Sequence, residues 1–374
     1  MLRLPPFEYL APRTVDEAIE MMTNNGWGAM LVAGGTDVYP GMKRRIFEPK
    51  KLVGLRNIKE LQRLEIGDLR PVLSVVEGLE MGETGDKTSI ENPKPVLSEG
   101  SPEQSRRVEV SKIQNRIALG AGLTLTQISS HPEIISRYPA LATAAGLVST
   151  PQLRNMGTIG GNLCVDTRCT YYNQTEPWRQ AINYCMKKDG DTCWVAPGSP
   201  RCWAVSSSDT APVMIALGAS VRLAGPMGER QIPVQSLYNN DGIEYLTRAP
   251  NEILVDITLP DASGVKMTYH KLRRRGSFDF PIVGVAAAIR QDEDGVCTEA
   301  NLVLGAVASY PIKAAEAEEL LVGEKITDEL IEEAAKVAFK PAKPLDNTDM
   351  GHPYRKQMVR VYVKRALREV TGLK

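Results

Sequence analysis

The sequence LVAGGTDV, residues 31–38, overlaps a short apolar run at 29–33. Its two glycines stand directly after that run, where a buried strand would end. Glycine adopts a positive φ without strain, and it has no side chain to keep a ligand away from the backbone. Successive amide groups in such a turn can form a concave site for an anion. The stretch therefore predicts a strand over 29–33 that leads into a phosphate-binding turn, which we call the first glycine loop (residues 31–38).

A second stretch of this kind, RNMGTIGGN at residues 154–162, adds a threonine hydroxyl and an asparagine amide to its glycines. We call it the second glycine loop. Neither loop has the GxGxxG pattern of a dinucleotide-binding βαβ unit, neither clearly opens a helix, and no GKS or GKT indicates a P-loop. A glycine turn after a strand is by itself common, but two such loops together can clamp the two phosphates of a dinucleotide.

The hydrophobic pattern predicts a protein with both helices and strands. Before residue 263 we expect one helix that begins near residue 14 and two more over 138–148 and 211–217. We expect strands there over 51–55, 219–223 and 252–259. After residue 263, strands at 266–274, 282–290 and 297–308 precede helices at about 313–321, 327–339 and 353–371. Strands followed by a run of helices are typical of a separate α+β domain. Residues 77–107, rich in Gly, Pro, Ser and Glu, predict a surface insertion.

Composition excludes several classes of function. The apolar fraction of 43% and the charged fraction of 24% are those of a globular protein, and 374 residues predict two or three domains. Lys plus Arg and Asp plus Glu number 45 each, so no net charge attracts nucleic acid or an anionic membrane. The sequence has no apolar run of membrane-spanning length and no signal peptide, so we expect a cytoplasmic protein with reduced thiols.

Five of the six cysteines lie between residues 161 and 203, and we call residues 164–203 the cysteine segment. Its cysteines are Cys164, Cys169, Cys185, Cys193 and Cys202. Four thiolates can hold a 4Fe–4S cluster or a tetrahedral zinc ion. Gaps of fifteen, seven and eight residues between the last four match neither compact ferredoxin motifs nor paired CxxC zinc motifs. Spacing alone therefore leaves an iron–sulfur cluster, zinc and no metal as alternatives.

The residues outside the cysteine segment predict no acid–base catalysis. The three histidines, His131, His270 and His352, form no recognisable triad or HExxH motif, and we identify no catalytic residue. Cys297 falls in a predicted strand and is expected to be a core thiol. The absence of catalytic motifs favours an electron-transfer role, in which cofactors carry the chemistry.

Four stretches in one order carry a family resemblance. They are LVAGGTDV at 31–38, RNMGTIGGNL at 154–163, SSSDTAPVMIALGA at 206–219 and YHKLRRRGSFDFPIVGVAAAI at 269–289. Together they resemble the FAD-binding subunit of the molybdenum hydroxylases, the xanthine dehydrogenase and CO dehydrogenase family. The resemblance implies an α+β fold, with a two-subdomain FAD-binding region of the vanillyl-alcohol-oxidase (PCMH) type before a CO-dehydrogenase-flavoprotein-like C-terminal domain. The expected domains are 1–60, 61–260 with the insertion 77–107 and an iron–sulfur segment at 164–203, and 263–374.

The same resemblance implies which residues would contact FAD. The first glycine loop would wrap the pyrophosphate with its amides, Thr158, Gly161 and Asn162 would contact the second phosphate and the ribityl chain, and Asp209 would bind a cofactor hydroxyl. Leu254 would pack against a ring of the cofactor, and Lys271 would lie near the isoalloxazine. The implied first-loop residues are Leu31, Val32, Ala33, Gly34, Gly35, Thr36, Asp37 and Val38.

Within this family, the stretch GNLCVDTRCTYYNQTEPWR at 161–179 and the later cysteines are similar to the beta subunits of the 4-hydroxybenzoyl-CoA reductases. That similarity implies a 4Fe–4S cluster, with Cys164 buried and unliganded. The implied ligands are Cys169, Cys185, Cys193 and Cys202.

The similarity also implies partners, namely a molybdopterin-bearing large subunit, a small subunit with 2Fe–2S clusters, and ferredoxin as electron donor. Electrons would pass through this chain to molybdenum, where the phenolic hydroxyl of 4-hydroxybenzoyl-CoA is removed. Two alternatives remain from the sequence. One is an FAD subunit of an oxidative molybdenum hydroxylase that acts on an aldehyde or N-heterocycle and reduces NAD or a quinone, and the other is a zinc-stabilised interaction module.

Overall fold

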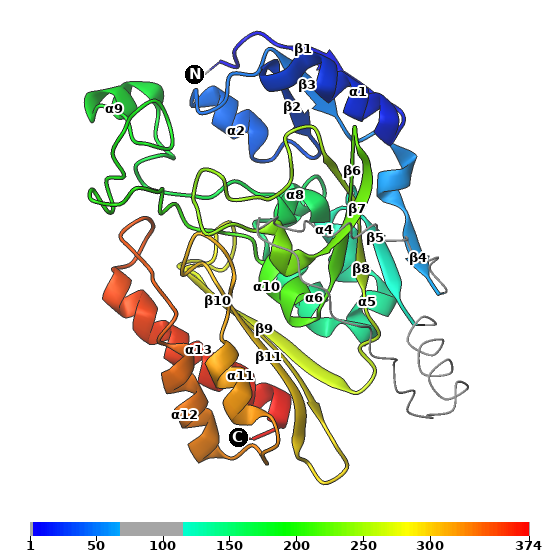
Figure 1. The fold of residues 1–374 in the computed structure, drawn as a ribbon, viewed down its shortest axis with the longest axis vertical. Helices are drawn as coiled ribbons and strands as arrows, with labels where there is room; N and C mark the ends of the chain where they lie inside the picture. The colour runs from blue at the N-terminus through cyan, green and yellow to red at the C-terminus, as the bar shows by residue number, and fades with distance from the viewer. Residues whose placement is uncertain (1–2, 68–114, 374) are drawn as a thin grey trace, which may run out of the picture.

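A computed structural model describes residues 3–67 and 115–373 of the chain, and the predicted insertion at 77–107 lies outside them. Three sheets organise the described residues, and helices cover them (Figure 1). Among the helices of the described residues, none combines the length and the apolar composition that a membrane span needs.

The N-terminal sheet is parallel and positions the first glycine loop. Its strands lie in the order β1 (Glu8–Leu10), β3 (Lys51–Gly54), β2 (Ala29–Val32). Helix α1 (Val15–Asn25) begins near residue 14, as expected, and the Thr14 hydroxyl caps it by accepting a hydrogen bond of 3.1 Å from the Glu17 amide. It packs its apolar face on this sheet, and η1 (Gly26–Gly28) leads from it into β2. Helix α2 (Val38–Lys43) begins where the first glycine loop ends.

The second sheet is antiparallel and carries most of the apolar core of residues 61–260, the region expected to bind FAD, which we call the FAD-region core. Its strands lie in the order β4 (Leu64–Ile66), β5 (Ile117–Gly120), β8 (Ile253–Leu259), β6 (Ser220–Gly225), β7 (Gly228–Pro233). In the chain, η2 (Lys59–Gln62) precedes β4 and η3 (Val234–Leu237) follows β7. The helices of this region are α4 (Leu125–Ser130), α5 (Pro132–Arg137), α6 (Pro139–Leu147), α7 (Pro151–Arg154), α8 (Ile159–Leu163) and α10 (Thr210–Ala216). Residues of this sheet and of α4, α6, α8 and α10 share one apolar core.

The C-terminal sheet is antiparallel in the order β12 (Ile312–Lys313), β11 (Cys297–Gly305), β10 (Val283–Gln291), β9 (Val265–Leu272). Successive side chains of a strand point to opposite faces. Val283, Val285 and Ile289 of β10 face a core shared with α11 (Ala315–Leu321), α12 (Asp328–Ala338) and α13 (His352–Thr371), whereas Ala286 and Ala288 join the FAD-region core. Because both faces of β10 are buried, this sheet joins the C-terminal domain to the FAD region.

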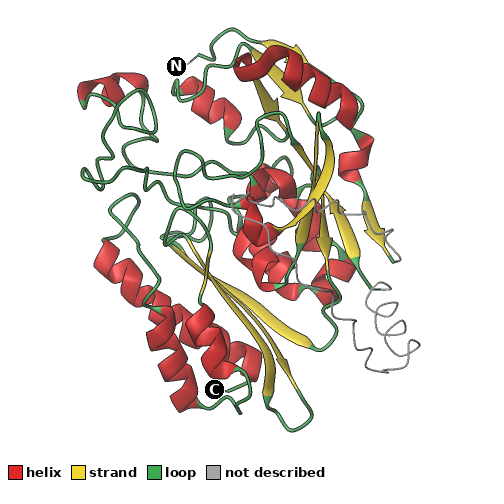
Figure 2. Cartoon of the chain, viewed as in Figure 1, coloured by secondary structure: helices red, strands yellow, loops and turns green. Residues whose placement is uncertain are grey.

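The cysteine segment is mostly irregular, as its glycines and prolines predict. Within it the structure has one helix, α9 (Glu176–Ala181), and otherwise the loops that lie between the N-terminal sheet and the C-terminal helices (Figure 2). All six cysteines are free thiols. Cys297 is fully buried in the C-terminal core, which confirms the core-thiol prediction, but Cys164 is half-buried rather than buried.

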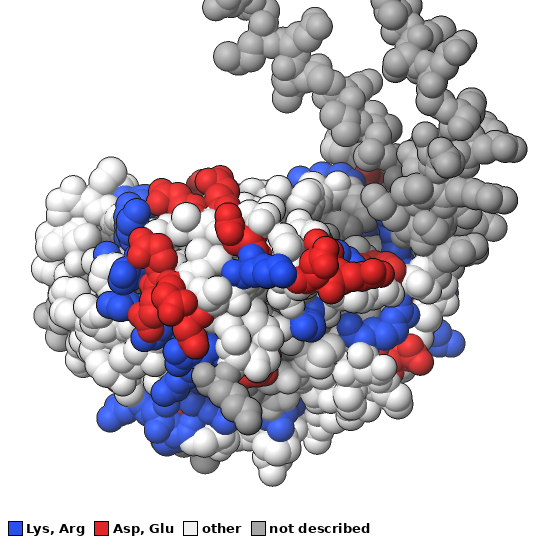
Figure 3. Space-filling view, turned by 90° about the horizontal axis from the view of Figure 1, so that it is seen from below, with Lys and Arg blue, Asp and Glu red and all other residues white. Residues whose placement is uncertain are grey.

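The observed fold confirms the predicted α+β class, and the predicted helices and strands are found within a few residues of their expected limits. One prediction was wrong: both glycine loops open helices, α2 and α8. These helices have six and five residues, too few for a helical period to show in the sequence. The lower end of the molecule carries acidic and basic side chains side by side, in keeping with the balanced charge (Figure 3).

Candidate functional site

The two glycine loops lie against each other. A β-carbon on Gly34 would lie 1.9 Å from the carbonyl oxygen of Met156, far inside any van der Waals contact. Gly35 has a φ of +71°, which favours glycine over any other residue. The loops are more than 100 residues apart in the chain, so this contact between their backbones is a property of the fold that brings two candidate phosphate-binding turns together.

The second glycine loop is held by its own helix cap. The Thr158 hydroxyl accepts a hydrogen bond of 3.1 Å from the Gly161 amide and so caps α8. The Gly157 carbonyl accepts a bond of 2.9 Å from the Leu125 amide. Gly161 itself is exposed, which leaves its backbone open to a ligand.

Asn162 joins the second glycine loop to residues 206–210. Its Oδ1 accepts hydrogen bonds from the Ser208 hydroxyl at 2.9 Å and from the Thr210 hydroxyl at 2.7 Å, and it also accepts one from the Thr210 amide at 3.2 Å. Ser208 and Thr210 are both buried. Because buried polar groups need partners, this amide oxygen fixes where α10 begins relative to the loop.

Asp209 and Lys271 form a buried ion pair with an Oδ2···Nζ distance of 2.9 Å, and their side chains are 3% and 1% exposed. The Tyr269 hydroxyl donates to the other carboxylate oxygen at 2.8 Å, and the Lys271 ammonium also donates to the Leu147 carbonyl at 3.0 Å. Burial raises the pKa of Asp209 and lowers the pKa of Lys271, in both cases against the attraction of the partner. Each charge therefore depends on the other.

Three of the residues predicted to contact FAD are engaged with other parts of the protein. Leu254 is 5% exposed, pairs with Leu223 across the sheet and belongs to the FAD-region core. The charged groups of Asp209 and Lys271 are occupied by each other. The cofactor contacts expected of these three residues stay predictions.

Four cysteines of the cysteine segment lie close together and are shielded from water. Their exposed fractions are 8% for Cys169, 6% for Cys185, 4% for Cys193 and 4% for Cys202. Cys169 lies near enough to Cys185 and Cys193 for their charges to raise its pKa, although burial is the larger cause of its rise to about 11. Cys193 and Cys202 lie close enough to act on each other, which lowers the pKa of Cys193 and contributes to the raised pKa of Cys202. These four are the cysteines predicted from the resemblance.

Backbone amides surround these sulfurs. The Ala204 amide donates to the Cys202 sulfur at 3.4 Å, and the amides of Tyr171 and Tyr172 act on the Cys169 sulfur to lower its pKa. Within residues 3–67 and 115–373, however, no three His, Cys, Asp or Glu side chains converge tightly enough to hold one metal ion. A tetrahedral zinc ion would need sulfurs about 3.8 Å apart, since Zn–S bonds are about 2.3 Å long.

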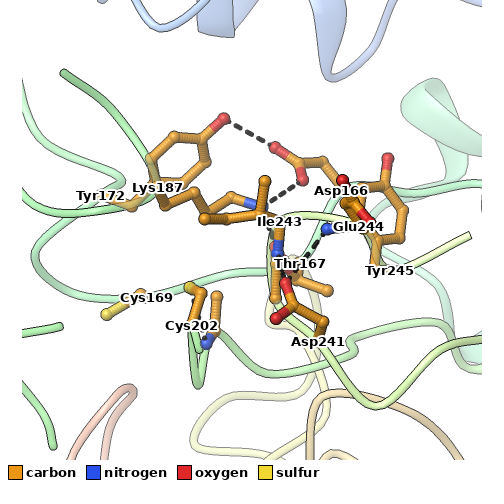
Figure 4. Close-up of polar contacts among 12 residues, drawn as sticks. Asp166, Thr167, Cys169, Tyr172, Lys187, Cys202, Asp241, Ile243, Glu244 and Tyr245 are labelled. Carbon is orange, nitrogen blue, oxygen red and sulfur yellow. Dashed lines mark hydrogen bonds and ion pairs between the residues drawn. The ribbon is translucent and has the colours of Figure 1, made fainter. Parts of the chain in front are cut away.

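A buried lysine, Lys187, lies near two of these thiols, Cys169 and Cys202 (Figure 4). The Lys187 side chain is 5% exposed, and its ammonium donates to Asp166 at 2.7 Å and to the Thr167 hydroxyl at 2.7 Å. Its nitrogen lies 4.7 Å from the ring centre of Tyr172, whose hydroxyl also donates to Asp166 at 2.8 Å. Its charge acts on Cys202 to lower the pKa of that thiol, although the overall direction there is upward because of Cys193 and burial.

The C-terminal domain also holds the cysteine segment. Asn347 donates through its side chain to the Trp203 carbonyl at 2.6 Å and accepts at its own carbonyl from the Thr170 amide at 2.9 Å. Arg355 of α13 is fully buried and donates to the Asn347 side chain at 3.2 Å. The sequence did not predict these buried contacts of Lys187, Asn347 and Arg355. An isolated charged or polar residue is normally expected to lie in solvent.

Two protein-family models match this chain. Residues 5–70 and 104–262, more than half of the chain, match the FAD-binding domain in molybdopterin dehydrogenase, and residues 267–370 match the CO dehydrogenase flavoprotein C-terminal domain. The chain is an FAD-binding medium subunit of the xanthine dehydrogenase and CO dehydrogenase family. It therefore binds FAD and is an oxidoreductase subunit of a molybdenum enzyme, and the predicted fold class is confirmed.

Similar proteins span this subunit almost completely. The nicotinate dehydrogenase FAD-subunit of Eubacterium barkeri is 25% identical over 96% of the chain and 94% of its own length. The carbon monoxide dehydrogenase medium chain of Hydrogenophaga pseudoflava is 26% identical over 97% and 96%. The solved carbon monoxide dehydrogenase of that organism superposes with a TM-score of 0.71 at 26% identity and covers 99% of each chain.

Proposed function

We propose that this FAD subunit also carries a 4Fe–4S cluster and serves a molybdenum-dependent reductase similar to 4-hydroxybenzoyl-CoA reductase. The observation that carries the proposal is that four buried thiols lie near one another in one segment of a flavin subunit. Four cysteine thiolates are the ligand set of such a cluster.

For FAD, the support is the contact between the two glycine loops. Amides of residues 31–38 would face the pyrophosphate, and Thr158, Gly161 and Asn162 would contact the second phosphate and the ribityl chain. The close approach at Gly34 and the exposed backbone of Gly161 fit a ligand that binds main-chain groups. The contacts proposed for Asp209 and Lys271 require their ion pair to open, so the two loops are the main support for this site.

For the cluster, the donor set fits in number, chemistry and burial. The proposed ligands are Cys169, Cys185, Cys193 and Cys202. Within the described residues these thiols do not form a preorganised site for a single tetrahedral ion such as zinc.

The chain's own residues would tune this site. When bound, a flavin and a four-iron cluster together supply one-electron and two-electron transfer. Tyr172 is 5% exposed and keeps water from the thiols, and the Lys187 ammonium offsets part of the negative charge that thiolates bring into a buried place. Backbone amides at Cys169 and Cys202 would donate to the ligand sulfurs.

The proposal includes a setting. The partners would be a molybdopterin-binding large subunit, a 2Fe–2S small subunit and ferredoxin as electron donor. Carbon monoxide dehydrogenases, to which this chain is similar, are molybdenum enzymes in the solved structures. Six free cysteines favour the cytoplasm, where thiols stay reduced.

A second function is favoured by the names of the similar proteins. Nicotinate dehydrogenase and carbon monoxide dehydrogenase are oxidative enzymes, so the alternative is an FAD subunit that delivers electrons from an aldehyde or N-heterocycle to NAD or a quinone. The four buried cysteines are the feature that this alternative leaves without a role.

An assay of the intact complex separates the two. We expect the complex, purified without oxygen, to remove the phenolic hydroxyl of 4-hydroxybenzoyl-CoA when reduced ferredoxin or a reduced viologen is supplied. The control is the same complex with an aldehyde or N-heterocycle and NAD or a quinone. Turnover in the oxidative assay alone would contradict the reductase proposal and favour the alternative.

A further inference from the structure

We propose that Arg168 and Arg179 are positioning residues that couple the cysteine segment to the first glycine loop, so that filling the four-cysteine site strengthens FAD binding. This inference rests on the proposed function. It goes beyond it because it assigns roles to two residues outside both sets of proposed ligands, and because it predicts that the two cofactors bind cooperatively.

Arg168 connects the cysteine next to it with the first glycine loop. It directly precedes Cys169, and its guanidinium forms an ion pair with Asp37 of the loop. The same guanidinium lies over the ring of Phe280 at 3.6 Å, and the Arg168 side chain is only 22% exposed. Burial lowers the pKa of Arg168 while Asp37 acts in the opposite direction, and an arginine stays charged in either case.

The backbone around Arg168 is equally fixed. Its amide donates to the Val205 carbonyl at 2.8 Å, and the Val205 amide donates back at 2.7 Å. Val205 follows Cys202 by three residues, so both ends of the cysteine segment meet here. A shift of either end moves the guanidinium that holds Asp37.

Arg179 holds the other end of α2. It is fully buried and donates to the carbonyls of Arg44 at 3.1 Å and of Arg45 at 2.9 Å, the two residues that follow the end of α2. It also pairs with Glu176, and Arg44 donates in return to the Asn173 carbonyl at 3.4 Å. The cysteine segment therefore contacts α2 at both ends, through Arg168 at its start and through Arg179 just after its end.

A movement of the cysteine segment that shifts helix α2 also shifts the first glycine loop, because α2 begins at the last residue of that loop. The loop in turn packs on Met156 with no spare room at Gly34. An arrangement of the cysteine segment that suits the cluster thus also sets the position of the loop. If one ligand favours an arrangement that the other also favours, each must strengthen the binding of the other by the same factor.

The test is the FAD dissociation constant of the full chain with and without the cluster, in two backgrounds. We expect Cys185→Ser, which removes one proposed ligand, to weaken FAD binding about tenfold in the wild-type background, within the usual range of coupling. In an Arg168→Met background the same change should matter less than about twofold. Arg168→Lys keeps the charge and should restore part of the coupling.

Arg201→Met is the matched control. Arg201 lies in the same segment but stacks on Trp203 at 3.6 Å and donates to the Asn240 carbonyl, away from α2. Its loss should leave the tenfold effect unchanged. A general loss of stability would weaken FAD binding in both metal states alike, so the ratio between them reports on coupling and not on folding.

Iron content measured on the same samples separates the possible failures. If Cys185→Ser loses its iron and binds FAD as tightly as wild type, the coupling inference is overturned and the proposed cluster stands. If Arg168→Met keeps the full tenfold effect, Arg168 does not carry the coupling. If Cys185→Ser keeps its iron, the proposed cluster itself fails.

Discussion

Replacing Gly34 with alanine is expected to cost the protein most of its FAD, with affinity at least about tenfold lower, which corresponds to about 1.4 kcal/mol. The new β-carbon would lie 1.9 Å from the Met156 carbonyl oxygen and 2.5 Å from the Met156 carbonyl carbon. Both atoms belong to the backbone, so no side-chain rotation relieves the overlap, and the two glycine loops must move apart. The measurement is FAD bound per chain, with the dissociation constant from flavin fluorescence.

Two controls sharpen this prediction. Gly28→Ala, at a glycine where a β-carbon would meet nothing within 4 Å, should bind FAD as wild type does. Met156→Ala combined with Gly34→Ala should not restore binding, because the obstructing atom is the carbonyl and not the side chain. Normal FAD binding by Gly34→Ala would show that the contact between the loops is unimportant for the cofactor.

The second large effect is expected on stability. Asp209→Asn should lower the free energy of unfolding by about 3–5 kcal/mol, because it leaves the Lys271 ammonium buried without a counter-charge. The Leu147 carbonyl, at 3.0 Å, would remain as its acceptor, and the side chain is 1% exposed. Denaturant unfolding of FAD-free protein measures the effect and keeps it separate from any contact with the cofactor.

The pH dependence of that variant has a definite sign. Burial lowers the pKa of Lys271 below its ordinary value of 10.5, and the loss of Asp209 removes the opposing attraction. The folded state then binds fewer protons than the unfolded state as the pH approaches 10.5, so stability rises with pH in that window. The deficit of Asp209→Asn should therefore shrink between neutral pH and pH 10.5.

The matched control is an exposed ion pair. Lys340 and Glu316 are 3.5 Å apart with side chains 64% and 73% exposed, so Glu316→Gln should change stability by less than about 1 kcal/mol. The double variant Asp209→Asn with Lys271→Met removes both buried charges and should recover part of the loss. A deficit below about 1 kcal/mol for Asp209→Asn alone would contradict the account of this pair.

The sequence predicted the local features of this protein well. The start of α1 near residue 14, the strand before Gly34 and the strands at the start of the C-terminal domain depend on neighbouring residues. Apolar residues that repeat every two residues in strands, or every three to four residues in helices, reveal such features. The odd and even residues of β10 belong to different cores, which explains why its sequence is an unbroken apolar run and not an alternating one.

Contacts between distant residues were not predictable in the same way. Asp209 and Lys271 were each expected to face the cofactor, but they are 62 residues apart and pair with each other. Arg168 and Arg179 carry no motif, and only the fold brings them to the two ends of α2. Short helices such as α8 were not predicted, because a helix of little more than one turn is too short to show a helical repeat of apolar residues.

The most direct test of the central claim is the iron and flavin content, together with the visible spectrum, of the chain purified without oxygen. The account predicts one FAD and one four-iron cluster per chain in the wild type. Cys185→Ser and Cys202→Ser should lose the iron and its broad absorption, whereas Cys164→Ser, outside the proposed ligand set, should keep both. Full iron content in Cys185→Ser and Cys202→Ser, or a wild-type protein that binds FAD but no iron, would contradict it.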